Sequence, residues 1–220
     1  MVKALVFDAY GTLFDVHSVR DECNRWFPDK GEAISQTWRD KQLNYFFLRQ
    51  LTERYKPFDQ VTKEALRYAC KANEATLTSE AEDALMEAYR NLELFDEVEE
   101  VLSVLGDKRL VVFSNGSPTM IDPLIQRSNI SGYIDEVLSA DEVKQYKPVP
   151  AAYSYAQQAL GLEKEDILFM SSNPWDITGA SSYGFRTAWI NRNGLPKEEL
   201  DIQPEVEYDS LSGLLEWKNS

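Results

Sequence analysis

Four short apolar runs that each end in Asp or Asn constrain the fold of this chain more than any other feature. They are ALVFD (ending at Asp8), RLVVFSN (109–115), DILFMSSN (166–173) and RTAWIN (186–191). Short runs that are rich in β-branched or aromatic residues and closed by polar residues are typical of buried parallel strands. A weaker run, YIDEVLSA (133–140), is a further candidate strand.

Helix-like stretches over 118–127, 150–160 and 175–183 separate the later runs. This alternation predicts an α/β fold with a doubly wound, Rossmann-like parallel sheet. The spacing between the first two runs is unusual, because roughly ninety residues separate Asp8 from Arg109 where a crossover normally needs one helix.

The long intervening stretch predicts amphipathic helices over 19–27, 34–54, 60–70 and 79–91, followed by a crossover helix over 97–105. Ser79 and Glu82 have the spacing of a capping box at the start of one of them. We therefore expect an α/β core domain made of residues 1–15 and 93–220, and a helical-bundle cap domain inserted at 16–92. The sequence contains no internal repeat and no low-complexity tract.

Composition excludes several classes of function. With 37 acidic and 23 basic residues the formal charge is −14, which disfavours nucleic acid and anionic membranes as partners. His17 is the sole histidine, so a histidine-rich zinc site is impossible and a Ser-His-Asp triad would have to use this residue.

The amino terminus turns polar too early for a signal peptide, and no apolar run approaches the ~20 residues of a spanning helix. Cys23 and Cys70 do not have the C-x-x-C spacing and are expected to be reduced thiols. We expect a soluble, cytoplasmic protein.

Polar residues gather where the predicted strands end, and ligands bind beyond the carboxyl ends of the strands in open parallel sheets. Taken singly, each has an ordinary explanation, such as an Asx turn, a solvated lysine or an acid in the first turn of a helix. Together they place a possible nucleophile, a cation and a second carboxylate at one edge. The residues are Asp8, Tyr10, Thr12, Ser114, Asn115, Lys147, Ser171, Asn173 and Asp176.

Four segments, FDAYGTLFD, VVFSNGS, YKPVPAAY and MSSNPWDITGA, resemble the haloacid dehalogenase superfamily. SSNPWD and the segment SQTWRDKQL (35–43) extend the resemblance to its L-2-haloacid dehalogenase branch, and it runs nearly end to end, cap included. It implies hydrolysis of short-chain L-2-haloalkanoic acids to D-2-hydroxyalkanoic acids and halide, with no cofactor or metal. It also implies a homodimer.

Phosphatases of this superfamily resemble one another in carrying a second Asp two residues after the nucleophile, and an acidic cluster that holds Mg²⁺. Here Tyr10 stands at that position, and Asp176 has no neighbouring acid. Halide leaves without a proton, and a haloacid monoanion can be balanced by a lysine, a hydroxyl and backbone N–H groups. Asp8 is therefore predicted to be a carboxylate nucleophile that needs no metal.

The resemblance implies a role for each site residue. Asp8 attacks carbon 2, and Asp176 activates water with Lys147 and Asn173, while Thr12, Ser171 and Tyr153 orient the site. Halide departs toward Arg39 with Asn115 as a second donor. Phe58 and Trp175 supply apolar walls. Ser114, the backbone N–H of Asn115 and Lys147 hold the substrate carboxylate, and Lys147 also keeps Asp8 ionised. The predicted substrate-binding set is Tyr10, Arg39, Phe58, Ser114, Asn115, Tyr153 and Trp175.

Two features of the cap stay open. Arg39 shares a helical stripe with Leu43 and Phe46, where an unpaired guanidinium is costly, but it could also extend to solvent. The charge of Asp40 would weaken halide binding if it faced inward. The aromatic run NYFFL (44–48) predicts either packing inside the cap or a dimer interface.

Two other functions remain possible at this point. One is a related hydrolase that acts on fluoroacetate or a phosphate ester, which metal dependence would distinguish. The other is a non-enzymatic protein of the same fold that binds a small anion. The full polar set argues against the second, since binding alone needs no nucleophile.

Overall fold

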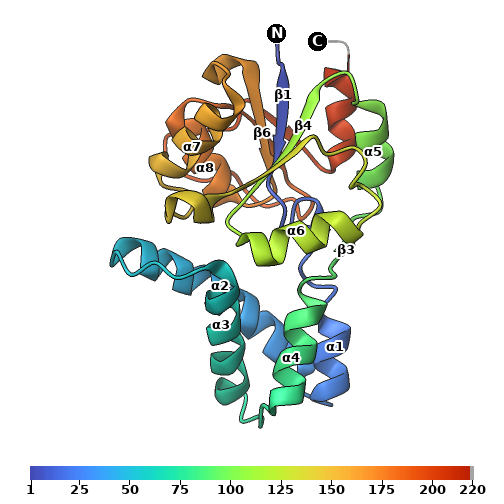
Figure 1. Ribbon diagram of the computed structural model, residues 1–220, viewed down its shortest axis with the longest axis vertical. Coiled ribbons are helices and arrows are strands. Elements are labelled where there is room, and N and C mark those ends of the chain that lie inside the picture. The colour runs from blue at the N-terminus through green and yellow to red at the C-terminus, as the bar shows by residue number, and fades with distance from the viewer. Residues whose placement is uncertain (219–220) are drawn as a thin grey trace.

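The computed structural model describes residues 1–218. A six-stranded sheet in the order β5-β4-β1-β6-β7-β8 forms the centre of the core (Figure 1). All its neighbouring strands run parallel, which confirms the predicted α/β fold. The strands are β1 (Ala4–Phe7), β4 (Arg109–Ser114), β5 (Glu136–Ser139), β6 (Ile167–Ser171), β7 (Arg186–Ile190) and β8 (Val206–Tyr208).

Alternate residues of the central strands face two separate apolar layers, which is why their sequences are apolar without interruption. Leu5 and Phe7 of β1 belong to the layer that contains side chains of α5 and α6, whereas Ala4 and Val6 belong to the layer of α7 and α8. The sequence analysis missed β8, whose three residues are partly or fully exposed and therefore lack this signal.

The core helices are α5 (Val98–Val104), α6 (Pro118–Arg127), α7 (Pro150–Leu160) and α8 (Pro174–Tyr183). Three short 3₁₀ helices accompany them: η1 (Ala140–Val143), η2 (Lys164–Asp166) and η3 (Leu211–Trp217). The predicted ranges of α6 and α7 are confirmed to the residue, since each begins with a proline at the first helical position. Within residues 1–218, no helix has both the length and the apolar character needed to traverse a bilayer.

Four helices stand apart from the sheet: α1 (Arg20–Trp26), α2 (Gly31–Leu51), α3 (Phe58–Ala72) and α4 (Ser79–Ala88) (Figure 1). A short antiparallel pair, β2 (Phe14–Asp15) and β3 (Glu93–Leu94), lies where the chain leaves the core and returns to it. The boundaries that we propose for the cap domain, 16 and 92, directly adjoin this pair.

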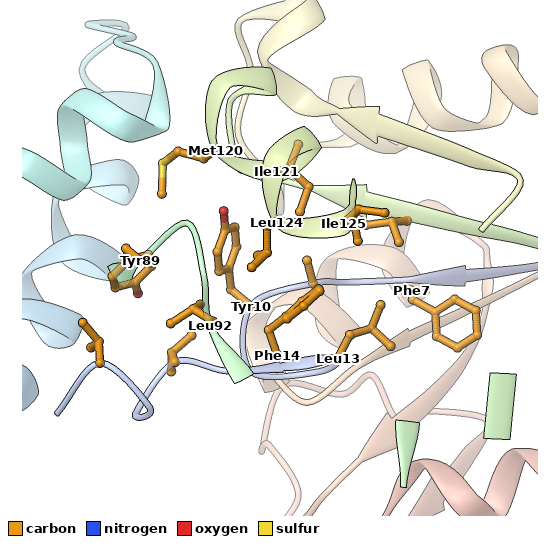
Figure 2. Close-up of a cluster of buried hydrophobic side chains, with 14 of the residues drawn as sticks. Phe7, Tyr10, Leu13, Phe14, Tyr89, Leu92, Met120, Ile121, Leu124 and Ile125 are labelled. Atoms are coloured by element: carbon orange, nitrogen blue, oxygen red, sulfur yellow. The ribbon is translucent and has the colours of Figure 1, made fainter. Parts of the chain in front are cut away.

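Apolar side chains join these four helices, which make up the proposed cap domain, to the core. Figure 2 shows Tyr10, from the loop after β1, between Tyr89 at the end of α4 and Leu124 of α6. Tyr10 is buried, and its ring centroid lies 5.9 Å from that of Tyr89. The loop that follows the predicted nucleophile is therefore part of the contact between cap and core.

The aromatic run 44–48 of α2 contributes to the same contact. Phe46 is fully buried, and its ring centroid lies 5.3 Å from those of Tyr146 and Trp175. Phe47 meets Trp175 edge-on. Leu48 is instead half exposed, so the run packs internally and still presents one apolar side chain to solvent.

The start of α4 differs from the predicted capping box. Thr78 precedes the helix, and its Oγ1 accepts a hydrogen bond from the backbone N–H of Ala81 at 3.2 Å. Glu82 instead pairs with Lys63 and Arg67 of α3. The helix begins one residue earlier than that motif requires, so Ser79 is already inside it.

Thr78→Ala should lower the free energy of unfolding by about 1 kcal/mol, because the backbone N–H of Ala81 loses its acceptor. Urea unfolding at constant pH measures this effect. Ser79→Ala is the matched control and should change stability much less. A larger loss for Ser79→Ala than for Thr78→Ala would contradict this cap.

Candidate active site

Asp8 immediately follows β1 at the carboxyl edge of the sheet. Its backbone N–H donates to the carbonyl of Met170 on β6 at 2.8 Å, so the parallel pairing extends one residue past the strand. Gly11 then adopts a φ of 88°, a left-handed value that favours glycine. The turn lets the Gly11 N–H bond to the carbonyl of Phe14 and leaves the Asp8 side chain at the strand end.

Lys147 lies between two carboxylates in the fully buried centre of the site. Its Nζ is 3.0 Å from Asp8 Oδ1, 2.6 Å from Asp176 Oδ2 and 3.0 Å from the carbonyl oxygen of Phe113. An ammonium group has three donors, so these contacts use all of them. The predicted contact of Lys147 with a substrate carboxylate would have to replace one of these bonds.

Burial and neighbouring charges of opposite sign act in opposite directions on the pKa of Lys147 and on that of Asp176. Burial alone would lower the pKa of Lys147, but the negative charges of Asp176 and Asp8 outweigh it and raise that pKa above its usual value. Burial raises the pKa of Asp176 to about 6, although Lys147 and Tyr153 act in the opposite direction. At neutral pH Asp176 is thus a carboxylate that accepts a proton more readily than an exposed one.

The second oxygen of Asp8 faces three donors. Asn173 Nδ2 lies 2.8 Å from Oδ2, Thr12 Oγ1 lies 3.2 Å away and Ser171 Oγ 3.3 Å away. The two hydroxyl oxygens in turn accept backbone N–H bonds, from Ser172 to Thr12 and from Asn173 to Ser171. The loops after β1 and β6 therefore hold the carboxylate in one orientation.

Asp176 lies in the first turn of α8, where the helix dipole favours negative charge. The hydroxyl of Tyr153 donates to Asp176 Oδ1 at 2.7 Å. Tyr153 is fully buried, and its contact with Asp176 agrees with the orienting role implied for it, whereas its place in the substrate-binding set stays a prediction. A Cβ at Gly179 would lie 2.4 Å from Pro148 Cβ, so glycine allows the Lys147–Pro148 loop to approach α8.

Arg39 of α2 faces the core, as predicted. Its Nη2 lies 3.4 Å from Asn173 Oδ1, and its Nη1 donates to Gln42 Oε1 at 2.7 Å. Gln42 also accepts a bond from the Tyr89 hydroxyl and donates to Thr62 Oγ1 at 2.8 Å. Side chains of α2, of α3 and of the end of α4 therefore fix the direction of this guanidinium.

Asp40 does not oppose this arrangement. Its side chain is exposed and accepts a hydrogen bond from Gln36 at 3.0 Å, so it points away from Arg39. The sequence analysis missed Gln42, because a lone glutamine carries no motif. Its position three residues after Arg39, on the same helical stripe, was the available signal.

Aromatic rings form the apolar wall of the site. The ring centroids of Tyr10 and Phe58 are 5.8 Å apart, and Phe46 links Phe58 to Trp175. Burial, Tyr89 and Asp8 raise the pKa of Tyr10 above its usual value, so its hydroxyl stays neutral. Neither the Tyr10 hydroxyl nor Trp175 Nε1 has a hydrogen-bond partner among residues 1–218, although both atoms are buried.

The loop after β4 supports Lys147 from the other side. Asn115 Oδ1 accepts the backbone N–H of Lys147 at 2.8 Å, and Nδ2 donates to the Lys147 carbonyl at 3.2 Å. A halide contact from this amide would use its second N–H. Ser114 Oγ accepts the N–H of Gly116 at 2.9 Å and keeps its own proton for another partner.

A cavity of about 340 Å³ lies beside this site: Arg39 and Asn173 are part of its wall, whereas Asp8 is not. His17 also lines it, and its backbone N–H donates to Asp15. In the part of the chain that the structure describes, no group of three or more His, Cys, Asp or Glu side chains could hold a metal ion.

The chain is similar to known proteins along most of its length. The haloacid dehalogenase-like hydrolase family model matches residues 2–184. An (S)-2-haloacid dehalogenase of Pseudomonas sp. (strain YL) is 44% identical, covering 98% of this chain and 94% of the relative. Haloacetate dehalogenase H-2 of Moraxella sp. (strain B) is 41% identical, covering 93% and 92%. A solved L-2-haloacid dehalogenase from Xanthobacter autotrophicus with covalently bound chloropropionic acid superposes with a TM-score of 0.92 at 33% identity, covering 97% of each chain.

Tyr153→Phe should move the titration of Asp176 to higher pH by about one unit. The substitution removes a hydrogen bond to the charged form, which contributes roughly 1.5–3 kcal/mol. Carboxyl ¹³C NMR over a pH series measures the midpoint. Tyr183→Phe is the matched control, since that hydroxyl bonds to Gln157 instead. An unchanged or lowered midpoint in Tyr153→Phe would refute the assignment of this contact.

Proposed function

The chain belongs to the haloacid dehalogenase-like hydrolases, and we propose that it hydrolyses short-chain L-2-haloalkanoic acids to D-2-hydroxyalkanoic acids and halide. One observation carries the mechanism: the Asp8 carboxylate is fixed by Lys147 on one oxygen and by Asn173 on the other, with Arg39 beside Asn173. Haloacetates are a second candidate substrate class, because the Moraxella relative is named for them.

In the first step, a carboxylate oxygen of Asp8 attacks carbon 2 of the substrate from the side opposite the halogen. The new C–O bond forms as the carbon–halogen bond breaks, and the halide leaves with the bonding electron pair. The configuration at carbon 2 inverts, and the product is an ester on Asp8. No proton is needed, which suits a site where Tyr10 stands in place of a second acid.

The cap and the aromatic wall serve the leaving group and the alkyl chain. Arg39 provides a fixed positive charge next to Asn173, where a departing halide would be stabilised. Phe58 and Trp175 limit the size of the alkyl group. Ser114 and the backbone N–H of Asn115 hold the substrate carboxylate.

In the second step, water attacks the carbonyl carbon of the Asp8 ester. Asp176 accepts the proton of this water, a task that its raised pKa favours, since bases work best with a pKa near the working pH. The proton then passes to the departing alkoxide oxygen of the 2-hydroxy acid. Thr12, Ser171 and Asn173 stabilise the negative charge that develops on the Asp8 oxygen.

The proposed reaction uses no metal and no cofactor. The buried ammonium of Lys147 balances both carboxylates, at 3.0 Å and 2.6 Å, and so supplies the positive charge that a divalent ion gives to phosphatases of this fold. A haloacid carries less negative charge than a phosphate ester, and Arg39 with neutral donors is sufficient for it.

We also propose that the protein is a cytoplasmic homodimer. Leu48 and Leu51 of α2 are 49% and 81% exposed, which offers apolar surface to a second copy of the chain. Cys23 and Cys70 are free thiols, which is typical of a reducing compartment. The homodimer should sediment as two subunits, and Leu51→Glu should shift it toward the monomer while halide release persists. Sedimentation of the wild type as a monomer would exclude this assembly, and cell fractionation tests the location.

L-2-chloropropanoate should yield chloride at the same rate with and without a chelator, and the D enantiomer should yield none. Asp8→Asn should lower the rate by at least roughly 10³-fold, because it removes the nucleophile. Asp166→Asn is the control, since that carboxylate pairs with Lys3 on the surface. Loss of activity in chelator would favour a metal-dependent hydrolase, and full activity of Asp8→Asn would exclude the ester mechanism.

A further inference from the structure

The turn after β7 carries an arginine to which the proposed reaction assigns no role. Arg192 lies beyond residues 2–184, which the family model matches, and its side chain is only 16% exposed. Its guanidinium carbon lies 3.9 Å from the centre of the Phe95 ring. The guanidinium thus lies over an aromatic face, a contact that suits arginine better than lysine.

The guanidinium bridges the two loops that orient Asp8. Its Nη2 donates to the Thr12 carbonyl at 3.0 Å, and its Nη1 donates to Ser172 Oγ at 2.8 Å. The Thr12 and Ser172 loops also meet directly, because the Ser172 N–H bonds to Thr12 Oγ1 at 2.8 Å. Arg192 therefore contacts Thr12, itself a donor to Asp8 Oδ2, and Ser172, which lies between the other two donors, Ser171 and Asn173.

A third contact ties this bridge to the segment that returns from the cap. Arg192 Nη2 lies 2.6 Å from Glu97 Oε1, and Phe95 belongs to the same segment. Glu97 Oε1 also accepts the backbone N–H of Leu211. The bridge is thus anchored to the core at two further points, so the loops of Thr12 and Ser172 cannot separate without breaking charged hydrogen bonds.

We propose that Arg192 is a positioning residue for the reaction: it clamps the Thr12 loop to the Ser172 loop and so keeps the Asp8 carboxylate aimed at carbon 2. The inference rests on the proposed function. A misplacement of about 1 Å at a reacting group can cost 10²-fold in rate, so the clamp should matter for turnover more than for substrate affinity.

The test compares Arg192→Met and Arg192→Lys with Arg186→Met. Arg186 is the first residue of β7, the strand that precedes the Arg192 turn, so it lies at the end of that strand away from the catalytic edge. It pairs with Glu205, and its guanidinium carbon lies 4.8 Å from the centre of the Trp217 ring. It therefore controls for the loss of one ion pair and one stacked guanidinium. Steady-state halide release and the melting temperature are measured for each variant.

Arg192→Met should lower kcat by roughly 10- to 100-fold and leave KM within about threefold. Arg192→Lys should recover part of the loss, because lysine keeps the charge but not the fork. Arg186→Met should keep the wild-type kcat. A folded Arg192→Met with a kcat within about twofold of wild type would overturn the proposal. The proposal would also be overturned if Arg186→Met lost as much kcat as Arg192→Met while the two variants had the same melting temperature. If Arg192→Met does not fold, Arg192→Lys provides the test, and a wild-type kcat for that variant would overturn the proposal.

A measurement that requires no catalysis tests the Arg192 clamp separately from the proposed function. The side-chain ¹⁵N–H₂ resonance of Asn173 reports its hydrogen bond to Asp8. It should shift in both Arg192 variants and stay unchanged in Arg186→Met. Absence of halide release from the wild type would defeat the proposed function, whereas an unshifted Asn173 resonance in the Arg192 variants would defeat the clamp.

Discussion

The site depends on one buried ammonium group. Lys147 is fully buried, and its Nζ is shared by Asp8, Asp176 and the carbonyl of Phe113. Charges out of contact with water are tolerated only when they are paired and hydrogen-bonded, and removing one partner leaves an uncompensated charge. The strands and loops that carry these residues must therefore keep their relative positions to within a hydrogen bond. The parallel sheet meets this requirement, because it brings β1, β4 and β6 to one edge.

In the reaction that we propose, the same ammonium lets two carboxylates take different parts. Asp8 lies at the strand end, where donors from two loops orient it for attack. Asp176 lies behind Lys147 and bonds to Tyr153, and burial raises its pKa, which suits a base. The cap contributes Arg39 from the opposite side through a network that includes Gln42. In the mechanism that we propose, core and cap thus supply the nucleophile and the halide site separately.

The sequence sufficed for five of the six strands of the sheet, because buried strands are uninterrupted apolar runs, but not for the exposed β8. It also sufficed for the residues at the strand ends, because parallel strands end at one edge. It did not predict which polar side chains bond to one another. Tyr153 contacts Asp176, and Asn115 holds the backbone of Lys147. Arg192 resembled any loop arginine. These contacts depend on rotamers and loop paths that link residues distant in sequence. The helix cap at Thr78 differed from the predicted one by one residue for a local reason, since Thr and Ser are both favoured N-cap residues.

The most direct test of the account is a single turnover in ¹⁸O-water with enzyme in excess over L-2-chloropropanoate, followed by mass analysis of peptides and product. Water that attacks the ester carbonyl leaves its oxygen on Asp8, so the account predicts label in the peptide that contains Asp8 and none in the first 2-hydroxypropanoate released. Label in that product, with an unlabelled Asp8 peptide, would mean that water attacks carbon 2 directly and would contradict a covalent role for Asp8.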